Sequence, residues 1–285
     1  MVLAFSSLLV SCGRSDSKTE WIEALGYTES DVIEVSFDQF GSPLVPVAVN
    51  DAYLSATFDT GNLVGLLVST ELANDLGLPV TGKRDLLSSS GDKVGEMHRY
   101  RVDSFHVFNQ KWTNVTAGEY VGNAVQAMVG PQFLKNARVT IDYPNKILAV
   151  SQTPTPDTSI AGTWVPMFVS PRFPELILVE GTIDDSPTLF AINTGKGRSS
   201  IDPDWARLLE LEPVRDGFYI ENIHIAGYTL TVRSARGERF TGLEQGINRA
   251  IKASIGADIL ADLRITIDYK QKRVYFYKEP IETES

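Results

Sequence analysis

The sequence predicts a mostly β protein made of two similar lobes that arose by internal duplication. Three observations indicate this fold class: short alternating apolar and polar stretches, blocks that recur at fixed spacing, and a polar segment between the two copies. The chain has 285 residues, 43% of them hydrophobic and 22% charged, so it is long enough for two lobes that each have a core.

The longest repeat lies near the end of each half. Residues Gly130–Lys146 align with Gly256–Lys272 without a gap, and both blocks contain an Ile-Asp-Tyr segment. In each block the glycine lies four residues before a leucine and twelve before the aspartate. This agreement over a whole block indicates duplication.

A second pair of blocks lies upstream of the first. Asn50 precedes Asp59 by nine residues, and Asp184 precedes Asn193 by the same number. Asn-Asp and Asp-Asp pairs favour tight hairpin turns, so each block predicts a hairpin whose second strand ends at a Thr-Gly pair. Two blocks in the same order with the same spacing make the duplication secure.

Alternation of apolar and polar residues predicts the strands. The clearest stretches are Val45–Val49, Tyr100–Val107 and Arg264–Tyr269. Residues Tyr143–Lys146 carry proline at the second position of a turn, and this predicts a hairpin between the strands on either side.

The helices are expected to be short. One is expected over Thr70–Leu76, ending at Gly77 in the left-handed conformation. Its counterpart begins with Asp202 as the N-cap and Pro203 at the first helical position. This second helix is expected to bury Trp205, Leu208 and Leu209. A further short helix is expected after each repeat glycine.

The first residues differ from the rest of the chain. An apolar stretch, Val2–Val10, runs into Leu9-Val10-Ser11-Cys12, which resembles the lipobox of bacterial lipoproteins, although the basic residues that usually open such a signal are missing. The alternative interpretation is the buried start of a first strand. The resemblance implies that Cys12, the only cysteine, is lipidated and that the mature protein is anchored in the cell envelope outside the cytoplasm.

Composition divides the chain into four parts. We expect a lipoprotein signal and tether over 1–20, a first lobe over 21–150, an interlobe linker over 151–160 and a second lobe over 161–285. The linker is expected because residues 151–159 are polar, contain two prolines and lack periodicity.

The run Phe58-Asp59-Thr60-Gly61 lies at the end of a predicted strand, with a short helix and the Gly130-x-x-x-Leu134 segment after it. In this context it resembles the retropepsin and pepsin aspartic proteases, and in particular a bacterial aspartyl-protease-like group whose units end in an Ile-Asp-Tyr hairpin. The resemblance covers about residues 30–277. It implies β-barrel lobes with the active-site cleft between them.

The resemblance also implies roles for the triplet. In such proteases each lobe presents one aspartate, and the pair shares a proton and holds a water that attacks the peptide bond. Thr60 and Thr194 would hold the two loops together across the lobes. Gly61 and Gly195 would permit the tight turns and the close approach of backbone amides.

The second triplet departs from this pattern, because it reads Asn193-Thr194-Gly195. An amide cannot hold or release the shared proton. We therefore expect Asp59 to stay ionised and to accept a hydrogen bond from the Asn193 side chain, so that a base is present and an acid is missing.

The stretch Leu86–Met97 resembles the flap hairpin that closes over a bound peptide in this family. Its tip is expected at Ser90, Gly91 and Asp92. The corresponding segment of the second half, Pro213–Tyr219, is shorter, which implies that only the first lobe covers the cleft.

Other classes of function are disfavoured. A net charge of −10 argues against a nucleic-acid partner, and the three histidines lack metal-ligand spacing, so neither a metal nor another cofactor is expected. Asp142 and Asp268, which recur in the repeats, are expected to bond their own hairpin turns rather than to act in a site.

Two hypotheses remain from the sequence. The first is a lipid-anchored monomer that binds an extended peptide or protein segment in the cleft with lost or impaired catalysis. The second is an active aspartic endopeptidase that acts through Asp59. A pairing of Asp59 with the same residue of a second chain is disfavoured, because the second lobe already occupies the partner's place.

Overall fold

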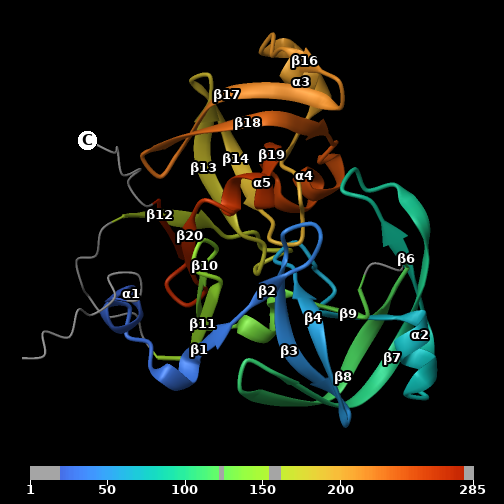
Figure 1. The fold of residues 1–285 in the computed structure, drawn as a ribbon. Coiled ribbons are helices and arrows are strands. Elements are labelled where there is room, and N and C mark those ends of the chain that lie inside the picture. Colours follow the sequence, from blue (N-terminus) through green and yellow to red (C-terminus); the bar gives the residue numbers. More distant parts are fainter. Residues whose placement is uncertain (1–19, 122–124, 154–161, 279–285) are drawn as a thin grey trace, which may run out of the picture.

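The computed structural model describes residues 20–121, 125–153 and 162–278. Strands dominate, the helices are short, and the strands form two curved sheets (Figure 1). The predicted mostly β fold is therefore confirmed. Cys12 and most of the predicted linker lie outside the described residues. In the part that is described, no helix is both long and apolar enough to cross a membrane.

The first sheet has eight strands, in the order β2-β3-β4-β9-β5-β8-β7-β6. Strand β3 also pairs with β7, and this contact closes the sheet into a barrel. The strands are β2 (Ser36–Phe37), β3 (Pro43–Val49), β4 (Ala52–Phe58), β5 (Leu66–Ser69), β6 (Val80–Leu87), β7 (Lys93–Val107), β8 (Gln110–Tyr120) and β9 (Ala127–Val129).

The second sheet has thirteen strands, in the order β1-β11-β10-β20-β21-β12-β13-β14-β19-β15-β18-β17-β16. It includes three strands of the first half: β1 (Val32–Glu34), β10 (Arg138–Asp142) and β11 (Ile147–Ser151). The others are β12 (Thr163–Phe168), β13 (Leu178–Ile183), β14 (Ser186–Ile192), β15 (Ser200–Ile201), β16 (Pro213–Val214), β17 (Gly217–Ile225), β18 (Tyr228–Gly237), β19 (Ile251–Ile255), β20 (Arg264–Asp268) and β21 (Arg273–Tyr277).

The two repeat blocks meet at the pair β10–β20. These strands run antiparallel with Thr140 opposite Thr266, and the two hydroxyl oxygens lie 2.7 Å apart. Every residue of both strands is buried. Neither face of β20 is exposed despite its alternating sequence, because polar members such as Thr266 point into the protein and are hydrogen-bonded there.

The hairpin turns follow the prediction. Asn50, Asp184 and Asp185 all have positive φ angles, of 52°, 44° and 64°. Asn and Asp tolerate this left-handed conformation better than other residues that carry a side chain. The turns therefore place β4 and β14 in register with β3 and β13, and both strands end at the Thr-Gly triplets.

The predicted helices are present. Helix α2 (Thr70–Asp75) is followed by Gly77 at φ +57°, and α3 (Pro203–Leu208) begins after Asp202, whose carboxylate accepts from two backbone amides. After the repeat glycines come the 3-10 helix η2 (Pro131–Leu134) and α5 (Ala257–Leu260). The prediction that Leu208 is buried is wrong, since 76% of it is exposed. Only the other side of this short helix, which carries Ala206, faces the core.

Three helical segments have no counterpart among the predictions: α1 (Glu20–Ala24), η1 (Glu29–Asp31) and α4 (Thr241–Ile247). Helix α1 lies beside the second sheet at the lower left of Figure 1. Its Trp21 is 3% exposed and packs with Leu25, Tyr27 and Ala149. The amphipathic pattern of this helix is too short to stand out against the polar residues before it.

Candidate active site

The two triplets lie at the ends of equivalent strands. Asp59 follows β4 and Asn193 follows β14, and each backbone amide donates to a carbonyl of the neighbouring strand, at Val129 (2.9 Å) and Ile255 (3.0 Å). These carbonyls close strands β9 and β19, each of which runs parallel to its partner. Duplication of the sequence has thus produced duplication of the loop geometry.

Thr60 and Thr194 join the two loops through four hydrogen bonds. Each backbone amide donates to the other threonine's hydroxyl at 3.0 Å. The Thr60 hydroxyl donates to the carbonyl of Ile192 at 2.9 Å, and the Thr194 hydroxyl donates to that of Phe58 at 2.7 Å. Both threonines are fully buried. This threonine bridge holds the loops in one fixed relation, as the family resemblance implies.

Gly61 and Gly195 allow each side chain to cross to the opposite loop. A methyl group on Gly61 would overlap the Asn193 amide, and one on Gly195 would overlap the Asp59 carboxylate. Any other residue at either position would therefore displace the group that faces it. The structure brings together all six residues of the two triplets.

The two side chains have matching orientations. The Gly61 amide donates to Asp59 Oδ1 at 2.7 Å, and the Gly195 amide donates to Asn193 Oδ1 at 2.9 Å. The expected hydrogen bond from Asn193 to Asp59 is not among those of the described residues. Each Oδ1 is engaged by its own loop instead, and this turns the Asn193 NH₂ group toward Gly61.

Burial raises the pKa of Asp59 to about 6. The backbone amides of Gly61, Asn62 and Gly195 and the charge of Lys196 act in the opposite direction, because they favour the carboxylate, but they only partly offset the loss of water. With this pKa Asp59 is mostly ionised at neutral pH and becomes protonated in mild acid.

An ion pair that the sequence analysis missed lies beside the triplets. Lys196 follows the second triplet, and its Nζ contacts the Glu238 carboxylate and the Ser200 hydroxyl. Burial alone would raise the pKa of Glu238, but the charge of Lys196 and hydrogen bonds from Lys196, Ser200 and Ser89 bring it below the usual value. Lys196 could have been noticed from its place after the triplet, whereas Glu238, at the end of a distant strand, gives no sequence signal.

A cavity of about 470 Å³ lies above the triplets. Its lining combines a largely apolar wall with charged groups from both halves of the chain. Among the lining residues are Asp59, Asn193, Lys196, Glu238, Arg84, Arg172, Leu86, Met97, Phe173 and Phe240. We call this cavity the cleft.

The hairpin β6–β7, with its turn at Ser88–Asp92, covers the cleft. Within the turn the Gly91 amide donates to the Ser88 carbonyl at 3.0 Å, and Gly91 takes a φ of +90°, which only glycine adopts easily. Of the three residues expected at the flap tip, Gly91 lines the cleft. Ser90 and Asp92 do not line it, and the Ser90 hydroxyl donates to Asp92 at 2.6 Å.

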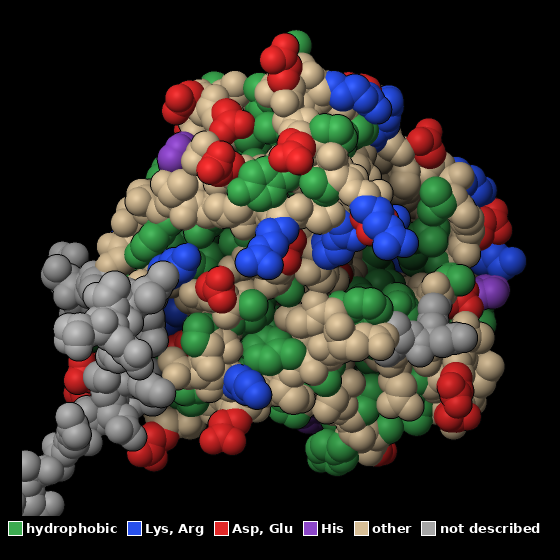
Figure 2. All heavy atoms as spheres, turned by 45° about the horizontal axis from the view of Figure 1, so that its top comes forward, with side chains coloured by type: hydrophobic (Ala, Val, Ile, Leu, Met, Phe, Trp, Pro, Cys, Tyr) green, Lys and Arg blue, Asp and Glu red, His purple; other side chains and the backbone are tan. Residues whose placement is uncertain are grey.

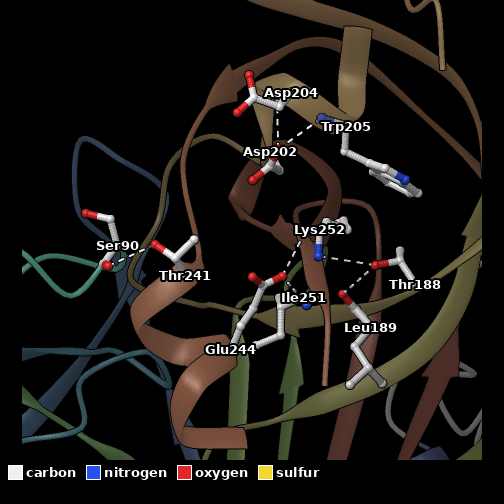
Figure 3. A network of polar contacts seen from close by, with 10 residues as sticks. All are labelled: Ser90, Thr188, Leu189, Asp202, Asp204, Trp205, Thr241, Glu244, Ile251 and Lys252. Atoms are coloured by element: carbon white, nitrogen blue, oxygen red, sulfur yellow. Dashed lines mark hydrogen bonds and ion pairs between the residues drawn. The ribbon is translucent and has the colours of Figure 1, made fainter. Parts of the chain in front are cut away.

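The flap touches helix α4 of the second half. The Ser89 carbonyl accepts from the amides of Gly242 (3.0 Å) and Leu243 (3.3 Å), and the Ser90 carbonyl accepts from the Thr241 hydroxyl at 2.9 Å. Figure 1 shows the β6–β7 hairpin reaching α4, and Figure 3 shows Ser90 facing Thr241. We call these three bonds the flap–α4 contact.

Helix α4 is itself held in place by charge. Glu244 accepts from the Ile251 amide at 3.0 Å and from Lys252 Nζ at 2.9 Å, and Figure 3 shows these contacts below Asp202. The helix therefore offers the flap a fixed partner, and the tip of the flap is held against it in this conformation.

The repeated aspartates do not join the site. Asp142 accepts from Asn145 and Asp268 from Gln271, each within its own hairpin turn. Within residues 20–121, 125–153 and 162–278, no group of three or more His, Cys, Asp or Glu side chains could hold a metal ion.

Comparison with known proteins agrees with this geometry. A family model described as "Aspartyl protease" matches residues 45–133, which include the first triplet and the flap. The structure is similar to that of an aspartic proteinase from Irpex lacteus, with a TM-score of 0.57 and 11% sequence identity, over 89% of this chain and 98% of that one. No curated protein matches. Residues 45–133 are therefore similar in sequence to aspartyl proteases, and the chain as a whole has the fold of a pepsin-like aspartic proteinase.

Proposed function

We propose that this protein binds an extended peptide segment in the cleft beneath the flap and hydrolyses it slowly or not at all. The observation that carries the proposal is the position of Asn193, whose side chain takes the place of the second carboxylate in an otherwise complete pair of loops. The bound segment belongs to a separate peptide or protein, and the protein described here binds it as a monomer.

The chemistry of the two side chains supports impaired hydrolysis. The Asp59 carboxylate can take a proton from a water molecule, but the oxygen of the scissile carbonyl then needs a proton donor. The Asn193 NH₂ group can offer a hydrogen bond but gives up no proton at ordinary pH. Loss of a general acid typically lowers a rate by about 10²–10⁴-fold.

A second candidate is an active endopeptidase that uses Asp59 alone. The pKa of about 6 favours it, since a base that titrates near neutrality is well suited to accept a proton from water. Such an enzyme would gain activity as the pH rises from about 5 to 7, because the reactive form of Asp59 is the carboxylate.

A peptide-library cleavage assay separates the two candidates. Wild type, Asp59→Asn and Asn193→Asp are incubated with a mixture of short peptides at acidic and neutral pH, and products are identified by mass spectrometry. We expect no cleavage by wild type, binding of a subset of peptides, and cleavage by Asn193→Asp in acid, where two close carboxylates share one proton.

The matched control is Asp51→Asn, which removes an exposed carboxylate from the turn before β4 and should behave as wild type. Cleavage by wild type that is lost in Asp59→Asn and retained in Asp51→Asn would establish the endopeptidase and refute the binding function. Failure of wild type to retain any peptide would refute peptide binding.

We also propose that Cys12 is lipidated and anchors the protein outside the cytoplasm. The support is the Leu-Val-Ser-Cys segment after an apolar stretch, with polar residues following it. Cys12→Ala should move the expressed protein from the membrane fraction to the soluble fraction and remove a lipid-sized mass from its N-terminal peptide. An unchanged distribution with no mass difference would contradict the anchor.

A further inference from the structure

The cleft continues past the flap into a second hollow. This hollow is lined by Val64, Arg84, Arg99, Thr116, Ala117 and Gly118. Val64 and Arg84 line both spaces, so the hollow is an extension of the cleft on the side of the first sheet. We call it the arginine hollow.

Two arginines stand on one face of the sheet above this hollow. Arg84 in β6 lies opposite Met97 in β7, and Arg99 lies two residues further along β7. Because residues two apart on a strand share a face, both guanidinium groups rise on the same side. Both residues are exposed.

The part of the hollow that lies over β8 is lined by Gly118 and its neighbours Thr116 and Ala117. Gly118 in β8 lies opposite Arg99. A methyl group there would come within 3.0 Å of atoms of Leu67, Met97 and Val64. The side chains of Leu67, Met97 and Val64 therefore pack against the backbone at Gly118 and leave no room for a side chain there.

The nearby acidic side chains are already engaged. Strands β6, β7 and β8 carry four of them. Asp85 (2.7 Å) and Glu96 (3.1 Å) both pair with Lys93. Asp103 pairs with Arg101 (3.2 Å), and Glu119 pairs with His98 (2.8 Å). Among the described residues, neither Arg84 nor Arg99 has a carboxylate partner within 4.0 Å. Two cations therefore face one hollow in a protein of net charge −10.

We propose that the arginine hollow is a subsite for an acidic side chain, Asp or Glu, of the peptide bound in the cleft. The inference rests on the proposed binding function and names its specificity. A guanidinium group matches a carboxylate through two parallel hydrogen bonds, and two such groups on one face can hold both carboxylate oxygens. Figure 2 shows several Lys and Arg side chains across the middle of the side of the molecule that it draws, with acidic groups above and below them.

The test uses pairs of peptides. A mixture of short peptides, capped at both ends, is first selected on wild type, and the bound peptides are sequenced. We expect Asp or Glu to be enriched at one fixed position. Replacement of that residue by Gln or Asn should weaken binding to wild type about tenfold, because it removes a charge-assisted hydrogen bond of about 1.5 kcal/mol. The difference in affinity should be smaller at high salt, which screens the charges.

The variants test the residues. In Arg84→Gln/Arg99→Gln the acidic peptide and its amide counterpart should bind equally, at the affinity that the amide peptide has for wild type. In Arg84→Glu/Arg99→Glu the preference should pass to a peptide with Lys at that position. Lys83→Gln is the matched control, since Lys83 is next to Arg84 but on the other face of β6, and it should keep the acidic preference.

Each outcome decides the proposal. Peptide binding without an acidic preference, or an acidic preference that survives in Arg84→Gln/Arg99→Gln, would overturn the subsite while the binding function stands. Binding of no peptide at all would overturn both. Circular dichroism and thermal unfolding of the variants establish that they are folded, which is expected because both arginines are exposed.

Discussion

At the scale of single residues, Asp59 and Asn193 share one geometry but differ in charge. Each accepts a backbone amide of its own loop and lies over the glycine of the other. The Asp59 carboxylate is only partly exposed to solvent, so its charged form costs free energy in the folded state. A paired carboxylate could share its proton, whereas the Asn193 amide cannot.

The raised pKa of Asp59 predicts that the free energy of unfolding depends on pH. The folded-state pKa of about 6 lies above the usual value of 3.8, so the folded protein binds the Asp59 proton more tightly than the unfolded chain does. The favourable contribution is complete below about pH 4 and is lost as the pH rises to about 6. Asp59→Asn should therefore gain on the order of 2 kcal/mol over wild type at pH 7 and little at pH 4.

Urea unfolding of both proteins at these two pH values measures the difference. Asp51→Asn serves as the control, because it removes an exposed carboxylate and should change stability little at either pH. An equal effect of Asp59→Asn at pH 4 and pH 7 would mean that the Asp59 pKa is not raised.

At the scale of elements, the flap and α4 form one closed unit. The flap–α4 contact is made of backbone carbonyls of Ser89 and Ser90, so it depends on the shape of the turn more than on its side chains. Gly91 and Gly242 face each other at its centre. A methyl group on Gly242 would overlap the backbone of Gly91.

Gly242→Ala should therefore push the flap away from α4. Alanine favours a helix more than glycine does, so α4 itself should remain folded. The Leu243 amide, which donates to Ser89, should exchange its hydrogen about tenfold faster, as expected for the loss of one or two hydrogen bonds. Amide hydrogen exchange followed by mass spectrometry or NMR measures this.

Gly95→Ala is the control for this substitution, since Gly95 lies in the same hairpin and has open space around it. Unchanged exchange at Leu243 in Gly242→Ala would show that the flap is not held by α4. Faster exchange in both variants would point to a general loosening of the hairpin.

The sequence predicts some elements and not others for definite reasons. Turns and caps depend on local residues, so Asn50, Gly77 and Asp202 were sufficient to place a hairpin, a helix end and a helix start. The threonine bridge could be expected only because the triplet is duplicated. Arg84, Glu238 and α4 meet in the cleft through long-range folding, and no local pattern in the sequence marks them.

At the scale of the whole molecule, the two halves share their core. One buried cluster includes Val45 and Phe58 from the first half and Ile192 and Ile265 from the second. The second sheet takes strands from both halves through β10–β20. Helix α1 covers part of this sheet, and its Trp21 packs close to the Arg264 guanidinium, 5.3 Å from the ring centre.

Trp21→Ala should consequently destabilise the whole fold. Removal of a buried tryptophan typically costs about 3–5 kcal/mol. Because Trp21 contacts strands of the shared sheet, the loss should appear in a single unfolding transition followed by both tryptophan fluorescence and circular dichroism. Tyr53→Ala, an aromatic residue that is 90% exposed, should cost little.

A cost for Trp21→Ala as small as that for Tyr53→Ala would mean that α1 is not part of the stable fold. Two separate transitions in wild type would mean that the halves unfold independently despite the shared sheet.

The side-chain amide of Asn193 has a practical consequence for assays of peptide cleavage. Hydrolysis of this side-chain amide consumes a water molecule, releases ammonia and leaves a carboxylate that the second loop can hold as the first loop holds Asp59, so the product needs no rearrangement. A small deamidated fraction of an aged sample would then carry two carboxylates, and trace turnover would belong to that fraction. Peptide mapping of the Asn193-Thr194 segment should therefore accompany every activity assay, on freshly prepared and stored protein alike.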